Sequence, residues 1–161
     1  MAVKILSNNG YAVITDFGNC SFLNTTGTFS KSDGIIAVNV TGPTSPGSST
    51  TRGFYFVVGN GGRRMNYSID MRFVSSESAS SVTLGNFAWE QATPRSITLT
   101  PDWQTFKGTF VRSQQQSYNA LVFYINGTTT FPLGTYYFRN INLERMPWIF
   151  TVNGKPLTIT T

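Results

Sequence analysis

The chain has 161 residues, of which 12% are charged and 14% aromatic, and its formal net charge is +5. This length suits one domain built around one hydrophobic core. With no histidine and one cysteine, the composition excludes disulfide frameworks, histidine-containing zinc sites and any catalytic triad or dyad that needs an imidazole.

Short segments in which apolar and polar side chains alternate follow one another along the chain. This alternation predicts β-strands with one buried face, and turn-forming residues separate the segments. No stretch has the sustained periodicity and caps of a helix. The segments expected as strands are residues 2–6, 11–17, 35–40, 54–58, 67–74, 82–89, 97–100, 103–110, 118–126 and 136–143, with short strands within 18–32 and a terminal hairpin of 149–152 and 157–159 around Asn153 and Gly154.

About eight to ten strands at short intervals predict an all-β fold, a two-sheet antiparallel β-sandwich of jelly-roll type. Residues 1–146 are expected to form this jelly roll, and residues 147–161 an edge hairpin or assembly extension of the same domain. Residues 41–52 contain no apolar side chain, which predicts either a mobile surface loop or a binding loop at one end of the sandwich.

Residues 96–111 are expected to form two strands that meet at a corner. Ile97 and Leu99 alternate with threonines, a turn follows, and the alternation resumes from Trp103. One face of each strand is therefore apolar and the other carries Thr, Gln and Lys. We expect Trp103 to anchor the core at this corner rather than to bind a ligand.

The acidic residues give no sign of catalysis. A glycosidase needs two carboxyl groups at a fixed separation, and the sequence pairs none of its seven acids in this way. The glycine-rich segment 59–64 is followed by a strand and not by a helix, so a hairpin turn is favoured over a phosphate-binding loop. We therefore expect no enzyme activity and no cofactor.

The basic residues are scattered, and Arg63 and Arg64 are the only adjacent pair. No helix or aromatic run accompanies a basic cluster, so we expect no nucleic-acid partner. The sequence has no run of about 20 apolar residues, and its amino terminus lacks the apolar stretch of a signal peptide. These features predict a protein that is made in a cytoplasm, which for a virion protein is that of the host cell, and that has no membrane partner.

Most of the aromatic residues are expected on the core faces of their strands: Phe54, Phe56, Tyr67, Phe73, Phe106, Phe110, Phe123 and Phe138. Several others fall outside these faces. Tyr124 lies on the face of its strand opposite Leu121 and Phe123. A ring with convergent hydrogen-bonding groups suits a sugar, whose C–H face stacks while its hydroxyls take directional bonds. The alternative is an exposed tyrosine that packs on a neighbouring subunit. The predicted glycan-binding residues are Tyr124, Asn126, Arg72, Asp70, Trp89 and Tyr55, with Thr83 on a neighbouring polar face and no catalytic or metal-binding residue.

Four segments spread over residues 8–145 carry a family resemblance. They read Asn-Asn-Gly-Tyr at 8–11, Gly-Arg-Arg-Met-Asn-Tyr-Ser-Ile-Asp-Met at 62–71, Leu-Thr-Pro-Asp-Trp-Gln-Thr-Phe at 99–106 and Tyr-Tyr-Phe-Arg-Asn-Ile-Asn-Leu at 136–143. In this order they resemble the Asn-Pro-Gly-Phe, Gly-Lys-x-Tyr-x-Leu-Ser-Phe, Leu-Thr-x-x-Trp-Gln-x-Tyr and Tyr-Tyr-Ile-Asp-Asn-Val-x-Leu elements of carbohydrate-binding modules of the family 4, 9 and 22 type. The resemblance implies a jelly roll whose glycan contacts lie on a concave sheet and its rim loops.

The resemblance also bears on metal binding. In these modules, an acid after the first element and the Asp of the closing strand commonly help to hold a structural calcium. The matching positions here are Ala12 and Arg139. Neither side chain supplies a carboxylate oxygen, and Arg139 would place a positive charge beside the ion. We therefore expect no calcium at that position.

The sequence predicts a non-catalytic glycan-binding or adhesion module displayed on a bacteriophage virion as a tail, baseplate, head-fibre or capsid-decoration component. The cysteine-poor, Ser/Thr/Asn-rich composition and the start at Met1 suggest this setting. The expected partners are host surface polysaccharide, other virion subunits and further copies in a homo-oligomer. The alternative is a purely structural decoration or assembly protein of the same fold, without sugar binding, whose exposed aromatics such as Trp148 and Phe150 bind neighbouring subunits.

Overall fold

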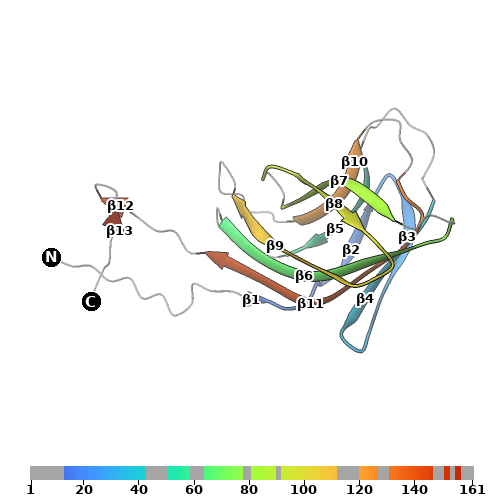
Figure 1. Cartoon of the computed structure of the whole chain (residues 1–161), viewed down its shortest axis with the longest axis horizontal. Helices are drawn as coiled ribbons and strands as arrows, with labels where there is room; N and C mark the ends of the chain where they lie inside the picture. The colour runs from blue at the N-terminus through green and yellow to red at the C-terminus, as the bar shows by residue number, and fades with distance from the viewer. Residues whose placement is uncertain are drawn as a thin grey trace.

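Two antiparallel β-sheets stacked face to face form the body of the protein, an all-β sandwich of jelly-roll type (Figure 1). The structure is a computed structural model, and it describes residues 13–42, 51–58, 64–77, 81–89, 92–111, 120–126, 131–146, 151–152 and 155–156. The fold class predicted from alternation is confirmed. The expected strand at residues 2–6 lies outside the described residues.

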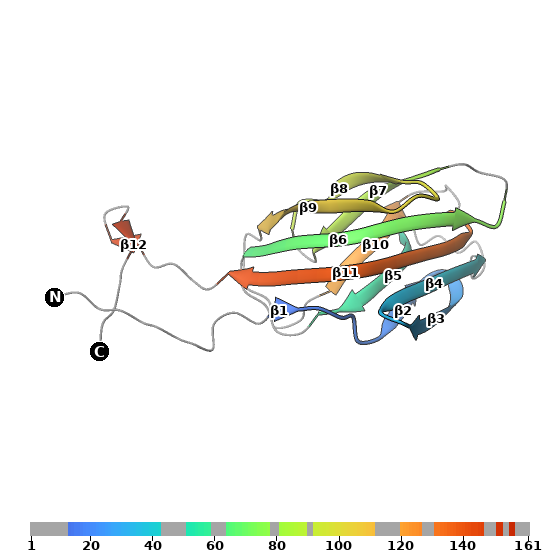
Figure 2. The same cartoon turned by 60° about the horizontal axis from the view of Figure 1, so that its bottom comes forward.

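Sheet 1 has the strand order β3-β4-β11-β6-β9, and β1 also pairs with β11. Figure 2 shows these strands side by side, with the second sheet behind them. In Figure 1, β6 and β11 bow so that their convex side faces away from the second sheet. The strands are β1 (Val13–Ile14), β3 (Thr26–Ser32), β4 (Ile35–Gly42), β6 (Arg64–Ser75), β9 (Gln104–Val111) and β11 (Gly134–Met146).

Sheet 2 has the order β2-β5-β10-β7-β8. Its central strand β10 pairs with β5 on one side and β7 on the other, although the three are far apart in sequence. Such long-range pairing brings chain segments together that local alternation cannot relate to one another. The strands are β2 (Cys20–Leu23), β5 (Thr51–Val57), β7 (Val82–Trp89), β8 (Arg95–Leu99) and β10 (Ala120–Asn126).

Aromatic rings fill the core between the sheets. Phe54 on β5 is fully buried, and its ring centroid lies 5.1 Å from the centroids of Phe123 and Tyr136. Offset-stacked and edge-to-face pairs of this kind add stability beyond the apolar area that they bury. Phe106 packs partly buried against this core, and the other core-facing aromatics predicted from alternation are confirmed as buried: Phe54, Phe56, Tyr67, Phe73, Phe110, Phe123 and Phe138.

The predicted corner in residues 96–111 is confirmed, because β8 belongs to sheet 2 and β9 to sheet 1. The Thr100 carbonyl accepts a hydrogen bond of 2.9 Å from the Phe73 amide, and the Thr100 amide donates one of 3.0 Å to Gln104 Oε1. These bonds satisfy backbone groups where the chain leaves one sheet for the other. The expectation that Trp103 anchors the core is wrong: its half-buried ring is not part of the core cluster.

The terminal hairpin forms as a separate two-stranded sheet, β12 (Thr151–Val152) with β13 (Lys155–Pro156). Its pairing agrees with the predicted turn at residues 153–154, and the further expected strand at 157–159 lies outside the described residues. The division into residues 1–146 and 147–161 stays a prediction. Within the described part of the chain, no helix is long and apolar enough to span a membrane.

Candidate functional site

The structure divides the predicted glycan-binding residues between the two outer faces of the sandwich. Tyr55, Tyr124 and Asn126 lie on strands of sheet 2, whereas Asp70 and Arg72 lie on β6 of sheet 1. On β6 the even-numbered positions face outward because the odd-numbered ones are buried in the core. The expected convergence of Asp70 and Arg72 with Tyr124 is therefore wrong, since the two groups point away from each other.

The outer face of sheet 2 carries two half-buried tyrosines close together. Tyr55 is paired across the ladder with Val122 on β10, and Ser21 lies on the other side of Tyr55. Tyr124 lies two residues beyond Val122 on the same face, so the two tyrosines are diagonal neighbours. Diagonal positions on adjacent strands are within reach of aromatic side chains.

Gly53 leaves room beside Tyr124. Gly53 pairs directly with Tyr124 on one side and with Leu23 on the other, and it carries no side chain to cover the sheet at this point. A β-carbon at position 53 would collide with the Phe123 carbonyl oxygen. On the opposite side of Tyr124, Asn86 of β7 is its partner in the ladder.

Neutral hydrogen-bonding groups surround the two tyrosines. Thr51 Oγ1 donates a hydrogen bond of 3.1 Å to Asn126 Oδ1 beyond Tyr124. Further along the same face, between β7 and the edge strand β8, Thr83 and Thr98 are hydrogen-bonded at 2.9 Å. Among the described side chains that the ladders of sheet 2 turn outward, none is charged. The face thus offers aromatic rings with hydroxyl and amide groups and no ionised group.

For two predicted elements of this site the structure describes no side chains. Trp89 is placed by its backbone, opposite Leu121 in the ladder between β7 and β10, but its side chain lies outside the described residues. The same holds for residues 43–50, most of the loop that was expected either to be mobile or to bind a ligand.

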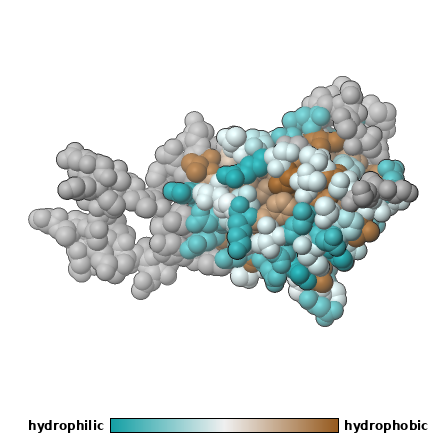
Figure 3. Space-filling view, viewed as in Figure 1, coloured by the Kyte–Doolittle hydropathy of each residue, from teal (hydrophilic) through white to brown (hydrophobic). Residues whose placement is uncertain are grey.

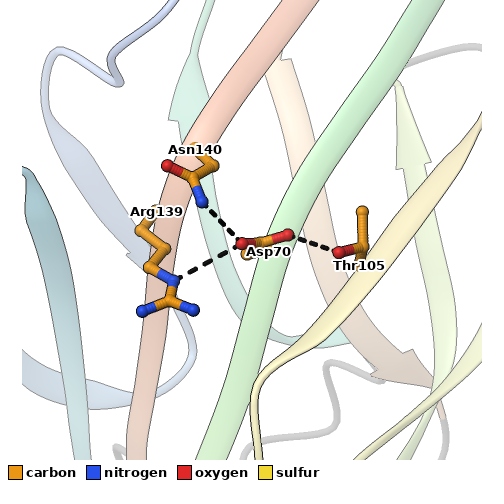
Figure 4. Close-up of polar contacts among 4 residues, drawn as sticks. All are labelled: Asp70, Thr105, Arg139 and Asn140. Carbon is orange, nitrogen blue, oxygen red and sulfur yellow. Dashed lines mark hydrogen bonds and ion pairs between the residues drawn. The ribbon is translucent and has the colours of Figure 1, made fainter.

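On sheet 1, Asp70 is enclosed by three donors (Figure 4). Thr105 Oγ1 and Asn140 Nδ2 donate to its carboxylate at 2.6 and 2.7 Å, and Arg139 Nε lies 3.4 Å from Oδ2. These groups, with Thr105 the largest contributor, lower the pKa of Asp70, while desolvation opposes them. Asp70 therefore holds neighbouring strands together and has little capacity left for a sugar.

A β-bulge in β11 makes this arrangement possible. The register between β11 and β6 shifts between Arg139 and Asn142, and Asn140 adopts a φ of 47°. Asparagine tolerates this left-handed conformation better than most residues. The bulge turns Asn140 as well as Arg139 toward Asp70 while Ile141 is buried.

Arg72 lies between two aromatic rings that the sequence did not connect with it. Its guanidinium carbon is 4.5 Å from the centroid of Tyr137 and 5.0 Å from that of Trp103, and the guanidinium carbon of Arg139 is 4.1 Å from the Trp103 centroid. Cations over aromatic faces at these distances are attracted by the ring quadrupole. The signal that could have placed Trp103 here is its alternation with Thr105 and Lys107, which assigns it to the outward face.

The Arg139 guanidinium also bears on the calcium expectation. Its contact with Asp70 places a cation, not an oxygen ligand, at the position where the resembling modules carry an acid. Ala12 lies outside the described residues. In the described ranges, no group of three or more Cys, Asp or Glu side chains could hold a metal ion.

Comparison with known proteins gives matches only among solved structures, since no family model and no curated protein matches. One match is a CBM4 module with a TM-score of 0.53, 17% identity, and coverage of 76% of this chain and 78% of that one. Another is the N-terminal cellulose-binding domain of Cellulomonas fimi β-1,4-glucanase C, with a TM-score of 0.52, 15% identity, and coverage of 84% and 95%. The chain has the fold of these carbohydrate-binding modules.

Proposed function

We propose that the chain is a non-catalytic glycan-binding module whose site is the outer face of sheet 2. The observation that carries this proposal is the pair Tyr55 and Tyr124, diagonal neighbours on adjacent strands. Their rings lie half-buried in the sheet surface, and the described outward side chains around them are uncharged. Of the six residues predicted from sequence, Tyr55, Tyr124 and Asn126 remain in the proposed site.

The chemistry of this face suits a neutral polysaccharide. Pyranose rings present C–H groups to an aromatic face, and their hydroxyls exchange hydrogen bonds with amides and hydroxyls such as those of Asn86 and Thr51. An uncharged face imposes no cost for desolvating an ion when such a ligand binds. Figure 1 shows sheet 2 on the concave side of β6 and β11, so the outer face of sheet 2 is turned away from these two strands.

The fold gives further support. The Cellulomonas fimi domain, which matches with a TM-score of 0.52, is a cellulose-binding domain. At 15% identity this likeness supports the proposal that a sandwich of this kind can carry a glycan site on one face. It does not say which glycan this chain binds. The proposed ligand class is therefore a neutral polysaccharide, and the particular sugar is left to the experiment.

The wider setting is a separate part of the proposal. Display on a virion, with attachment to host surface polysaccharide and assembly with other subunits, is supported by the composition: 12% charged residues and one cysteine in a chain rich in Ser, Thr and Asn. Co-sedimentation of the protein with purified virions would support this setting. If the protein is absent from virions, the proposed virion display is wrong, whereas the proposed glycan site on sheet 2 is unaffected.

The experiment is affinity electrophoresis through gels that contain hydroxyethylcellulose, xylan or mixed-linkage β-glucan. We expect at least one polymer to retard the wild type, and Tyr55→Ala and Tyr124→Ala each to weaken binding about fivefold or more, because stacking with a ring is lost. Lys107→Ala on exposed sheet 1 surface is the control and should bind as the wild type does. Absence of retardation in every polymer would favour the structural alternative, as would retardation that neither tyrosine variant changes.

A further inference from the structure

The outer face of sheet 1 differs in character from that of sheet 2. At its centre, Tyr137, Arg72, Trp103 and Arg139 form a contiguous cluster, with both guanidinium carbons within 5.0 Å of an aromatic centroid. The rings hold the arginine side chains in place, so that less side-chain entropy remains to be lost when their N–H groups bind an anion. We call these four residues the arginine–aromatic cluster.

The positive charge of Arg72 is not neutralised within the described chain. Its guanidinium makes no hydrogen bond or ion pair to a described residue, and its Nε is buried without a partner. Arg139 uses only its Nε, at 3.4 Å from Asp70, and its side chain is 39% exposed. Both Nη groups of each arginine therefore remain available as donors, in the fork geometry that matches a carboxylate.

The chain itself offers little that could supply the missing anion. Outside the described ranges the sequence contains a single acidic side chain, that of Glu90. A second copy packed through the same face would oppose arginine with arginine. The anion is therefore expected from a different molecule.

Cations extend from this cluster along the strands. On the outward face, Lys107 pairs with Ser68, Arg139 with Asp70, and Arg72 with Tyr137, in three successive rows of the ladder. Successive outward rows are about 6.7 Å apart. Arg64 begins the same face at the other end of β6. A linear ligand with one negative charge on each repeating unit would meet several cations, whereas a small anion would meet one.

The moderate charge of the face distinguishes between polyanions. The described outward side chains of β6, β9 and β11 include the cations Arg64, Arg72, Lys107 and Arg139 and the carboxylates Asp70 and Glu144. Nucleic-acid affinity comes mainly from Lys and Arg side chains that neutralise closely spaced phosphates, and carboxylates placed among them would repel the backbone. A polymer of lower charge density, in which sugar rings separate the carboxylates, fits this pattern better.

We propose that the outer face of sheet 1 is a second binding surface, for a linear acidic polysaccharide of the polyuronate class, with Arg72 and Arg139 as the carboxylate-binding residues. This surface is on the opposite side of the sandwich from Tyr55 and Tyr124 and does not depend on them. The two sites therefore predict separable ligands, a neutral glycan for sheet 2 and a uronate polymer for sheet 1.

The test is isothermal titration of the full chain with polygalacturonate oligosaccharides at about 0.05 M and about 0.5 M NaCl, since screening should abolish most of the binding at the higher salt. We expect Arg72→Gln to weaken binding about tenfold, equivalent to about 1.4 kcal/mol. The Arg72 guanidinium donates no hydrogen bond to an acceptor within the described chain. Arg72→Gln therefore leaves no acceptor without its donor. Lys107→Gln, at an exposed position, is the second variant should Arg72→Gln fail to fold, with a smaller loss expected.

Lys31→Gln is the matched control, because it also removes one positive charge. Lys31 pairs with Asp16 near the β3–β4 hairpin and is not part of the arginine–aromatic cluster. This variant should bind polygalacturonate as the wild type does. Tyr124→Ala should also leave polygalacturonate binding unchanged, and Arg72→Gln should leave neutral-glycan binding unchanged. Failure of either site is thus distinguishable from failure of the other. The proposal is overturned if polygalacturonate does not bind, if Arg72→Gln and Lys107→Gln bind it as the wild type does, or if duplex DNA binds more tightly with the same dependence on Arg72.

Discussion

Gly53 on β5 lies directly opposite Tyr124 on β10, at a backbone φ of 154°. A β-carbon there would collide with the carbonyl oxygen of Phe123, a backbone atom that cannot move without disturbing the ladder. We expect Gly53→Ala to lower the free energy of unfolding by at least about 2 kcal/mol. Urea denaturation followed by tryptophan fluorescence measures this change.

Gly18→Ala is the control for that measurement, because nothing lies within 4 Å of a β-carbon at Gly18. The free energy of unfolding of this variant should stay within about 0.5 kcal/mol of the wild type. Equal stability of the two variants would mean that the close approach of β5 and β10 at Gly53 is absent in solution.

Asp70 should stabilise the fold at neutral pH and lose this role in acid. Its pKa is lowered in the folded state by Thr105, Asn140 and Arg139, so the unfolded chain binds the proton more readily. The contribution is complete above the unfolded value of about 3.9 and is lost as the pH falls through the folded pKa. We expect Asp70→Asn to cost about 1 kcal/mol at pH 7 and progressively less below about pH 4.

Asp33→Asn is the matched control for Asp70→Asn. Asp33 is an exposed turn residue with a φ of 51°, a conformation that asparagine also tolerates. At pH 7 its substitution should leave the free energy of unfolding within about 0.5 kcal/mol of the wild-type value. If Asp70→Asn has the same pH profile as the wild type, the three hydrogen bonds do not contribute to folding.

Cys20 should be an unreactive thiol. Burial raises the pKa of Cys20 to about 12, and only the thiolate is an effective nucleophile. At pH 8 we expect iodoacetamide to modify the folded protein far more slowly than it modifies glutathione. Once guanidinium chloride has unfolded the protein, Cys20 should react at a rate similar to that of glutathione. Mass spectrometry of timed samples gives both rates, and fast modification of the folded protein would contradict the burial of this side chain.

Phe54 is expected to be among the most sensitive core positions. It is fully buried and contacts the rings of Phe123 and Tyr136 from the two sheets. Phe54→Ala should lower the free energy of unfolding by about 3–5 kcal/mol through lost burial and the cavity left behind. Val57→Ala on the same strand, at a side chain that is 41% exposed, should change it by about 0.5 kcal/mol or less.

A chelator should not affect stability. Arg139 contacts Asp70 where the resembling modules place a calcium ligand, so EDTA is expected to leave the Tm unchanged. Thermal unfolding with EDTA, and with EDTA followed by excess calcium, provides the comparison. A fall in Tm that calcium reverses would show that other oxygen ligands compensate for Arg139.

Strand positions and buried faces followed from the sequence because they are local properties. Residues 82–89 were expected as a strand and form β7, and residues 67–74 lie within β6. Period-two alternation is set within one segment and needs no knowledge of its neighbours. The aromatic core residues, such as Phe54 and Phe123, were predicted for the same reason.

The assignment of strands to sheets was not accessible in this way. Asp70 and Tyr124 each lie on a polar face, but alternation does not say which sheet their strands join. Long-range pairing places β6 between β11 and β9, and β10 between β5 and β7. The prediction for Trp103 was wrong for a related reason. Alternation placed Trp103 on the outward face with Thr105 and Lys107, but its apolar ring favoured a core position. The residues that hold its ring on the surface, Arg72 and Arg139, come from other strands.

The two outer faces of the sandwich point in opposite directions and are separated by the thickness of two stacked sheets, about 10 Å between sheet planes. A single polymer strand cannot lie along both faces at once without turning around an edge of the domain. If both faces are occupied, each protein molecule joins two separate polymers and acts as a cross-link. A mixture of neutral and acidic polysaccharide should then gain viscosity on addition of the monomeric protein, whereas neither polymer alone should.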